Sequence, residues 1–217
     1  MTIDKLYLDG KDIQELYGFL LKWRTLSAPN IKSNYKAIIG MQGDLDLTES
    51  LGDVFYENRV IDMGMKHPDD NWYADYESLM NEFHGKDVHI KFENDPDWYW
   101  AGRISIGGYS ARNHDLSMTA SVFPFKLAET KTVISLSVDA ENEAAAETIF
   151  LPPSRLKVSP KFTATTENGL TVKWGTSTAS VSAGSHYVDG LTVGASGLTI
   201  KVWGTGTMQI DYRVGSL

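Results

Sequence analysis

Histidine, cysteine and serine supply most metal ligands and nucleophiles in proteins, and this chain arranges few of them in a useful pattern. It contains no cysteine, which excludes thiolate zinc sites, iron–sulfur clusters and cysteine nucleophiles. His84 and His89 straddle Gly85, so they do not share one helix face as an H-E-x-x-H zinc site requires. No serine lies in a G-x-S-x-G nucleophile elbow. We therefore expect neither a bound metal nor a cofactor.

Carboxylates cluster in two segments that could suit calcium or acid–base chemistry. Residues 43–49 begin like a calcium loop but carry Glu49 where an EF-hand needs glycine. Their alternation of Asp and Leu is typical of a half-exposed strand instead. Asp95 and Asp97 lie in an Asn-Asp-Pro-Asp turn, where such side chains usually bond to the local backbone. These patterns predict that the chain is not an enzyme.

Aromatic residues in predicted strands are the remaining candidates for function. In the run Trp98, Tyr99 and Trp100, the two tryptophans share one strand face and Tyr99 lies on the other. Such a face is usually covered by the core or by a neighbouring subunit, so we take this strand, with Arg103, as a candidate oligomer interface or covered strand.

Sugar stacking is the alternative use of aromatic side chains. In the C-terminal part, Trp174, Tyr187 and Trp203 are the candidates for a carbohydrate-binding surface.

The elements that must position these residues fall into two parts. With 217 residues, the chain can form one large or two small domains. Residues 1–129 hold 13 Lys and Arg against 21 Asp and Glu, whereas residues 130–217 hold seven of each. All of the net charge of −8 is therefore in the first part, which argues against a nucleic-acid-wrapping protein. No apolar run is long enough to span a membrane. We expect an N-terminal domain at 1–130 and a C-terminal domain at 131–217.

The first part reads as a sheet with one helix. Apolar residues at helical spacing predict a helix over about 69–84, with Asp69 or Asp70 as the cap after Pro68. Period-two patterns on both sides predict strands at 6–8, 19–26, 60–65, 88–92, 98–106 and 116–123.

The second part reads as a small antiparallel β-sandwich or a partly open barrel of five to eight short strands. The boundary is expected within 127–155, where Asp139 to Glu147 form a polar connection before two prolines. Asn168 and Gly169, between alternating segments, predict a tight hairpin turn. The fold class is therefore mainly β, with an α+β N-terminal domain.

A series of features in the first part resembles a known family. They are Phe55 to Ile61 with its arginine-led strand, an Asp-Pro turn at Asp95, the strand Tyr99 to Ile104 with its Gly-Arg pair, and the aromatic-Pro-aromatic step before Lys126. In this order they resemble the distal tail protein family of long-tailed phages of Gram-positive bacteria. Residues 158–163 and 204–217 resemble the two ends of the galectin-like β-sandwich that follows the belt domain in that family.

The resemblance implies a structural protein of the virion, made in the host bacterial cytoplasm. It implies a homo-oligomer in which six belt domains close into a ring at the end of the tail tube. The expected partners are tail-tube, tail-tip and receptor-binding or baseplate proteins, with no membrane. Viral DNA would pass through the ring without tight binding, and the acidic charge would either line this channel or face outward for solubility.

Two other functions compete with the tail hub. The first is a carbohydrate-binding β-sandwich protein, and the second is a cell-wall hydrolase, which would need a carboxylate pair in a cleft.

Overall fold

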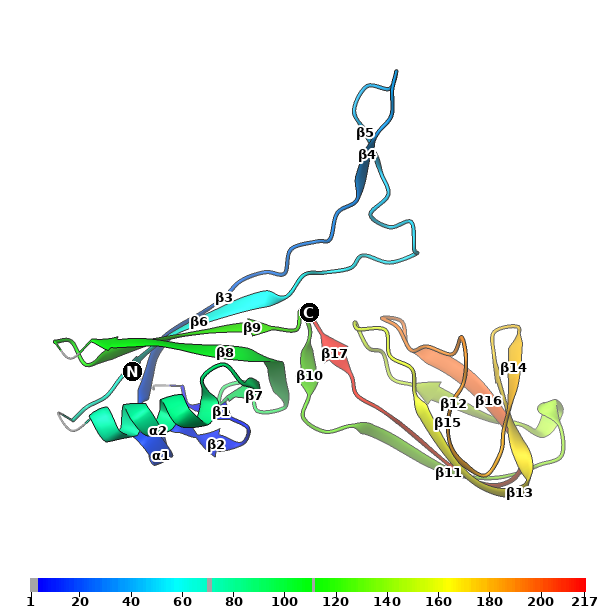
Figure 1. Cartoon of the computed structure of the whole chain (residues 1–217). Coiled ribbons are helices and arrows are strands. Elements are labelled where there is room, and N and C mark those ends of the chain that lie inside the picture. Colours follow the sequence, from blue (N-terminus) through cyan, green and yellow to red (C-terminus); the bar gives the residue numbers. More distant parts are fainter. Residues whose placement is uncertain (1–3, 70–71, 111) are drawn as a thin grey trace. The chain divides into compact units, whose positions relative to one another are not determined.

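The computed structural model describes residues 4–69, 72–110 and 112–217, and the chain divides into two compact units, Met1–Lys126 and Leu127–Leu217. Figure 1 shows a first unit of sheet and helices and a second unit made almost wholly of strands. No helix among the described residues is long and apolar enough to cross a membrane.

The first unit is built on an antiparallel sheet with the strand order β2-β1-β7-β8-β9-β6-β3. Each strand predicted from period-two patterning is present, with ends shifted by a few residues. The strands are β1 (Leu6–Leu8), β2 (Lys11–Asp12), β3 (Leu20–Leu26), β6 (Arg59–Lys66), β7 (Asp87–Phe92), β8 (Trp98–Ser110) and β9 (Asp115–Val122). Period-two patterning predicts these strands because one face of the sheet packs into the core and the other meets water, as the alternation of buried and exposed residues along β9 illustrates.

The helix predicted over about 69–84 is α2 (Tyr73–Phe83), which begins later than expected. Asp69 is not its cap, because the Asp69 carbonyl and amide both lie within hydrogen-bond distance of His67 Nδ1, in a turn that precedes the helix. Asp70 lies outside the described residues. The N-cap position is Trp72, which makes no side-chain capping bond.

A second, short helix escaped the sequence analysis. α1 (Ile13–Tyr17) is capped by Asp12, whose carboxylate accepts hydrogen bonds from the amides of Gln14 and Glu15. It ends at Gly18, which has φ of +70°. This capping pattern is a readable helix-start signal, but five residues are too few to show helical periodicity.

The apolar face of the sheet closes because residues near its two ends meet across the core. Arg24 on β3 lies opposite Met63 in the β3–β6 register, so it points to the core side. Its guanidinium lies 3.7 Å from the centre of the Phe92 ring on β7. The strands β3 and β7 are four positions apart in the sheet, so this contact requires the sheet to curl.

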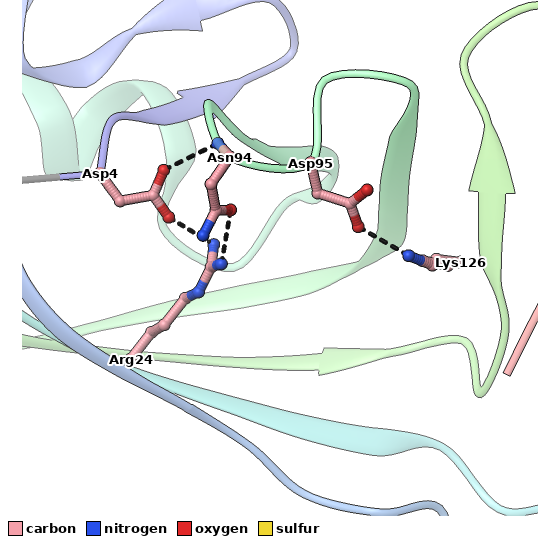
Figure 2. Close-up of polar contacts among 5 residues, drawn as sticks. All are labelled: Asp4, Arg24, Asn94, Asp95 and Lys126. Atoms are coloured by element: carbon pink, nitrogen blue, oxygen red, sulfur yellow. Dashed lines mark hydrogen bonds and ion pairs between the residues drawn. The ribbon is translucent and has the colours of Figure 1, made fainter.

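Polar contacts complete this closure, as Figure 2 shows. Arg24 Nη1 lies 2.8 Å from Asp4 Oδ2, and Arg24 Nη2 donates to Asn94 Oδ1 at 2.6 Å. The backbone N–H of Asn94 donates to Asp4 Oδ1 at 3.0 Å. Asp4 Oδ2 and Arg24 Nη1 are both shielded from water and are misaligned for a hydrogen bond, so their contact is an ion pair.

Between β3 and β6 the chain leaves the sheet as a two-stranded ribbon, here called the arm (residues 27–58). Its strands are β4 (Tyr35–Ala37) and β5 (Asp44–Asp46), which pair with each other. Figure 1 shows the ribbon extending beyond β3 and β6. The predicted strand at 43–49 is therefore present as Asp44–Asp46, whose three residues are exposed, with Leu45 the partly covered one at 37% exposed.

The second unit is built around two long strands, and each end of this strand pair is flanked by a different set of shorter strands. β13 (Lys161–Trp174) and β16 (Leu198–Tyr212) pair along most of their length. One end of this pair is flanked by β11 (Thr132–Ala140) and β15 (Gly184–Tyr187). The other end is flanked by β12 (Glu147–Leu151) and β14 (Ser177–Val181). The short strand β10 (Lys126–Ala128) pairs with β17 (Gly215–Ser216), which lies near the C-terminus.

The hairpin turn predicted at Asn168 and Gly169 is wrong. These residues lie inside β13, where the β13–β16 register shifts between Thr166 and Leu170. Gly169 has φ of +85°, and on β16 a Cβ at Gly204 would lie 2.9 Å from the Gly169 carbonyl oxygen. The Asn-Gly pair thus lies in a bulge, where Gly169 supplies the positive φ and Gly204 on the partner strand allows the close backbone approach.

The polar stretch Asp139 to Glu147 lies inside the second unit. It links β11 to β12 through the 3₁₀-helix η1 (Glu143–Ala145). A polar composition marks this loop as exposed, but it does not distinguish a loop within a sandwich from a connection between domains.

Near the end of β16, the buried Tyr212 hydroxyl donates to the Pro152 carbonyl at 2.7 Å, and burial raises the pKa of Tyr212 to about 12.

We predict that Arg24→Ala destabilises the first unit by about 2–3 kcal/mol, because it leaves Asp4 buried without its partner and uncovers Phe92. Denaturant unfolding followed by tryptophan fluorescence measures this loss. Lys32→Ala on the exposed arm is the control and should change stability by less than about 0.5 kcal/mol. A loss for Arg24→Ala as small as that of the control would contradict the proposed role of this contact in closing the sheet.

Candidate functional site

The residues considered for metal or acid–base chemistry serve structural contacts. Among the described residues, no three His, Asp or Glu side chains are grouped so that they could hold a metal ion. Asp95 forms an ion pair with Lys126, with Asp95 Oδ2 and Lys126 Nζ 2.7 Å apart (Figure 2). His84 Nδ1 accepts a hydrogen bond from the Ile106 amide at 3.0 Å. These side chains link the helix and the turns to the sheet.

The aromatic strand is largely used inside the first unit. Tyr99 and Trp100 are 7% and 6% exposed, so both faces of the strand are covered at this point. The Tyr99 ring lies 4.3 Å from the ring of His89 on the neighbouring strand. Trp98 is half-buried, with Lys126 Nζ 5.0 Å from its ring centre. Arg103 is exposed, and its guanidinium donates to the Gly85 carbonyl.

Arg59 is the residue of this region that sequence reasoning undervalued. It is 8% exposed, with its guanidinium 4.7 Å from the centre of the Trp100 ring. Its Nε donates to the Ser27 carbonyl at 2.8 Å, which fixes the base of the arm. Burial lowers the pKa of Arg59 from its ordinary value. An arginine opening a predicted strand gave no sign that it would be buried, since this depends on where Trp100 and Ser27 lie.

The three candidate sugar-stacking residues of the second unit do not share one surface. Trp174 lies opposite Ile200 in the β13–β16 register, whereas Trp203 lies opposite Thr171. Because neighbouring positions alternate between sheet faces, the two tryptophans lie on opposite faces. Tyr187 is 67% exposed, but it ends β15, which pairs with the other end of β13.

The arm concentrates exposed apolar side chains. No residue between 22 and 58 is buried. The arm contains eight of the 18 exposed large apolar side chains among the described residues: Ile31, Tyr35, Ile38, Ile39, Met41, Leu45, Leu51 and Phe55. A concentrated apolar surface of this kind marks an interaction site on a soluble protein.

Comparisons with known proteins identify the fold. No protein-family model matches the chain, and no curated protein matches it in sequence. Among solved structures, the chain is similar to the Dit protein (gp 19.1) of phage SPP1, described as a paradigm of the hub adsorption apparatus in phages that infect Gram-positive bacteria. The TM-score is 0.67 at 14% sequence identity, and the match covers 98% of this chain and 99% of the other. The expected fold class is thereby confirmed: this chain has the mainly β, two-part fold of a phage distal tail protein.

Proposed function

We propose that this protein is a structural hub of the adsorption apparatus at the tip of a phage tail. One observation carries the proposal: the likeness to the Dit protein extends over 98% of this chain and 99% of that protein, so it includes both units. The SPP1 protein is a component of a hub and not an enzyme. Tyr99 and Trp100 are buried and Asp95 forms an ion pair with Lys126, which agrees with a structural role for these residues.

A hexameric ring is the form in which we propose that the protein acts. A cyclic assembly joins two different surfaces of the same chain head to tail. The first unit offers the extended arm as one such surface, because the arm exposes apolar side chains and has no core of its own. The ring would connect the tail tube to tail-tip and receptor-binding proteins in the virion.

We further propose that DNA leaves the phage through this ring without being held by it. The first unit carries a net charge of −7 out of the −8 of the whole chain, because it holds 13 Lys and Arg against 20 Asp and Glu, and six copies would multiply this charge around the opening. Phosphates bind where Lys and Arg replace their counterions, and an acidic ring offers the opposite charge. Whether the carboxylates line the opening or face outward, the ring has no excess of cations with which to retain DNA.

We predict that the purified protein forms a closed ring, alone or on a tail-tube or baseplate partner. Six copies of the 24.1 kDa chain would have a mass of about 145 kDa. Light scattering after size-exclusion chromatography measures this mass, and negative-stain imaging shows the shape. A mass of one chain at tens of micromolar protein, with and without tail partners, would refute the ring.

We predict that this assembly does not bind duplex DNA at about 150 mM salt, where charge repulsion still acts over roughly 8 Å. Fluorescence anisotropy with a labelled duplex measures binding. A basic DNA-binding protein serves as the positive control. Binding that weakens steeply with added salt would show a cationic surface and contradict the proposal of unhindered passage.

The carbohydrate-binding alternative leads to a separate prediction. Because Trp174 and Trp203 lie on opposite faces of the sheet, we expect no specific signal on a glycan array. If a specific signal is found, Trp203→Ala and Tyr187→Ala test it, with circular dichroism to confirm that each variant is folded. Binding that is lost in either folded variant would favour the carbohydrate-binding hypothesis over the proposed tail hub.

A further inference from the structure

Asn168 is the one asparagine of this sequence that precedes a glycine, and the pair lies in an irregular part of β13. Residues 167–169 (Glu-Asn-Gly), here called the bulge, have no paired residue among the described strands. Pairing of β13 with β16 is interrupted between Thr166 and Leu170. Pairing with β15 ends at Ala164, and pairing with β14 begins at Leu170. The register that fixes the backbone in the rest of β13 is therefore absent in the bulge.

The residue of β16 that faces the bulge is engaged by a neighbouring side chain. Thr205 is the single residue between Gly206 and Gly204, which pair with β13 on either side of the bulge. The carbonyl of Thr205 accepts a hydrogen bond from the Thr166 hydroxyl at 2.8 Å. Three residues of β13 thus lie opposite one residue of β16, which leaves the bulge with more backbone than the register uses.

The Asn168 side chain is exposed and makes no hydrogen bond with the part of the chain that the structure describes. Two other asparagines differ in this respect. Asn94 Oδ1 accepts from Arg24 Nη2 at 2.6 Å, and Asn142 Oδ1 accepts from the backbone N–H of Ala144 at 3.0 Å. These contacts fix the side-chain amides of Asn94 and Asn142, whereas water reaches that of Asn168.

An asparagine followed by glycine can react with its own backbone. The Gly169 nitrogen attacks Asn168 Cγ and forms an N–C bond, and the Cγ–Nδ2 bond breaks. The proton lost by the Gly169 nitrogen leaves with Nδ2 as ammonia, and a five-membered cyclic imide remains. Water then opens the imide at Cγ to give aspartate, or at the main-chain carbonyl to give isoaspartate. Glycine favours the attack because it has no Cβ to obstruct the nitrogen and adapts to many backbone conformations.

We propose that Asn168 in the bulge of β13 is a site of spontaneous deamidation in the folded protein, which converts with time to aspartate and isoaspartate. Water is the only co-reactant. One new carboxylate in place of the amide changes the net charge of the chain from −8 to −9. Isoaspartate also adds one carbon to the main chain, and the bulge has room for it because its backbone is not held in register.

Peptide mapping of the full-length protein tests this proposal. The folded protein is incubated at mildly alkaline pH, and samples are digested with trypsin at successive times. The fragment 162–173 contains Asn168 as its single asparagine, and the fragment 132–155 contains only Asn142, which is also exposed but precedes glutamate. We expect Asn168 to convert at least about tenfold faster than Asn142, because glycine leaves its nitrogen unobstructed. Labelling with isoaspartyl methyltransferase identifies the isoaspartate product.

A variant and a second condition separate the site from its sequence context. Asn168→Gln has a longer side chain that would have to close a six-membered ring, so we expect it to keep its melting temperature and to form no new acidic species on ion exchange. The time course is repeated on the chain in denaturant. Because the bulge is unpaired and Asn168 is exposed, we expect the folded and unfolded chains to convert at comparable rates.

Each result decides for or against the site. Conversion of Asn168 in the folded chain, with aspartate and isoaspartate both present and no acidic species from Asn168→Gln, supports the proposal. Conversion confined to the unfolded chain overturns it, because the fold would then protect the bulge. An acidic species that persists in Asn168→Gln, or equal conversion of Asn168 and Asn142, also overturns it. None of these outcomes alters the proposed hub.

Discussion

The first unit depends on closing one face of a seven-stranded sheet with little helix to cover it. Its two helices span only Ile13–Tyr17 and Tyr73–Phe83, so much of the apolar face must be covered by the curl of the sheet itself. Arg24 fixes this curl, because its guanidinium packs on Phe92 and forms an ion pair with Asp4 in a place that water does not reach. An arginine serves both purposes, since its flat guanidinium stacks on a ring while its nitrogens bind carboxylate and amide oxygens.

The arm follows from the same architecture. Once β3 forms the edge of the sheet, the chain between β3 and β6 has no further strand to pack on and continues outward as a ribbon. Arg59 holds the start of this ribbon by donating to the Ser27 carbonyl while it packs against Trp100. The aromatic strand thus has an indirect part in assembly. Its tryptophan is buried, and it positions the arginine at the base of the surface that we propose makes contact between copies.

The second unit solves the covering problem differently. The long strands β13 and β16 pair with each other, and each half of this pair has different neighbouring strands: β11 and β15 at one end, β12 and β14 at the other. The strands thus enclose a core without a covering helix. The bulge in β13 needs glycine at Gly169, which has φ of +85°, and at Gly204, where a Cβ would lie 2.9 Å from the Gly169 carbonyl oxygen. Trp174 and Tyr187 lie at opposite ends of β13 and its partner strands, which weighs against a common sugar-binding surface.

Local patterns in the sequence determined the mainly β fold class, most strand positions and the long helix, because period-two and helical spacing reflect which face of an element is buried. The resemblance to distal tail proteins rested instead on the order of particular motifs along the first part of the chain. Local patterns also placed Asp95 in a turn, but its carboxylate pairs with Lys126 and not with the local backbone as expected. Only the tertiary structure decided that Asn168 and Gly169 form a bulge, that Arg24 packs on Phe92 and pairs with Asp4, that Arg59 is buried, and that residues 27–58 leave the sheet as an arm. A turn and a bulge use the same residues, and a buried and an exposed arginine look identical in sequence. What separates them is the position of partners distant along the chain, which local spacing does not encode.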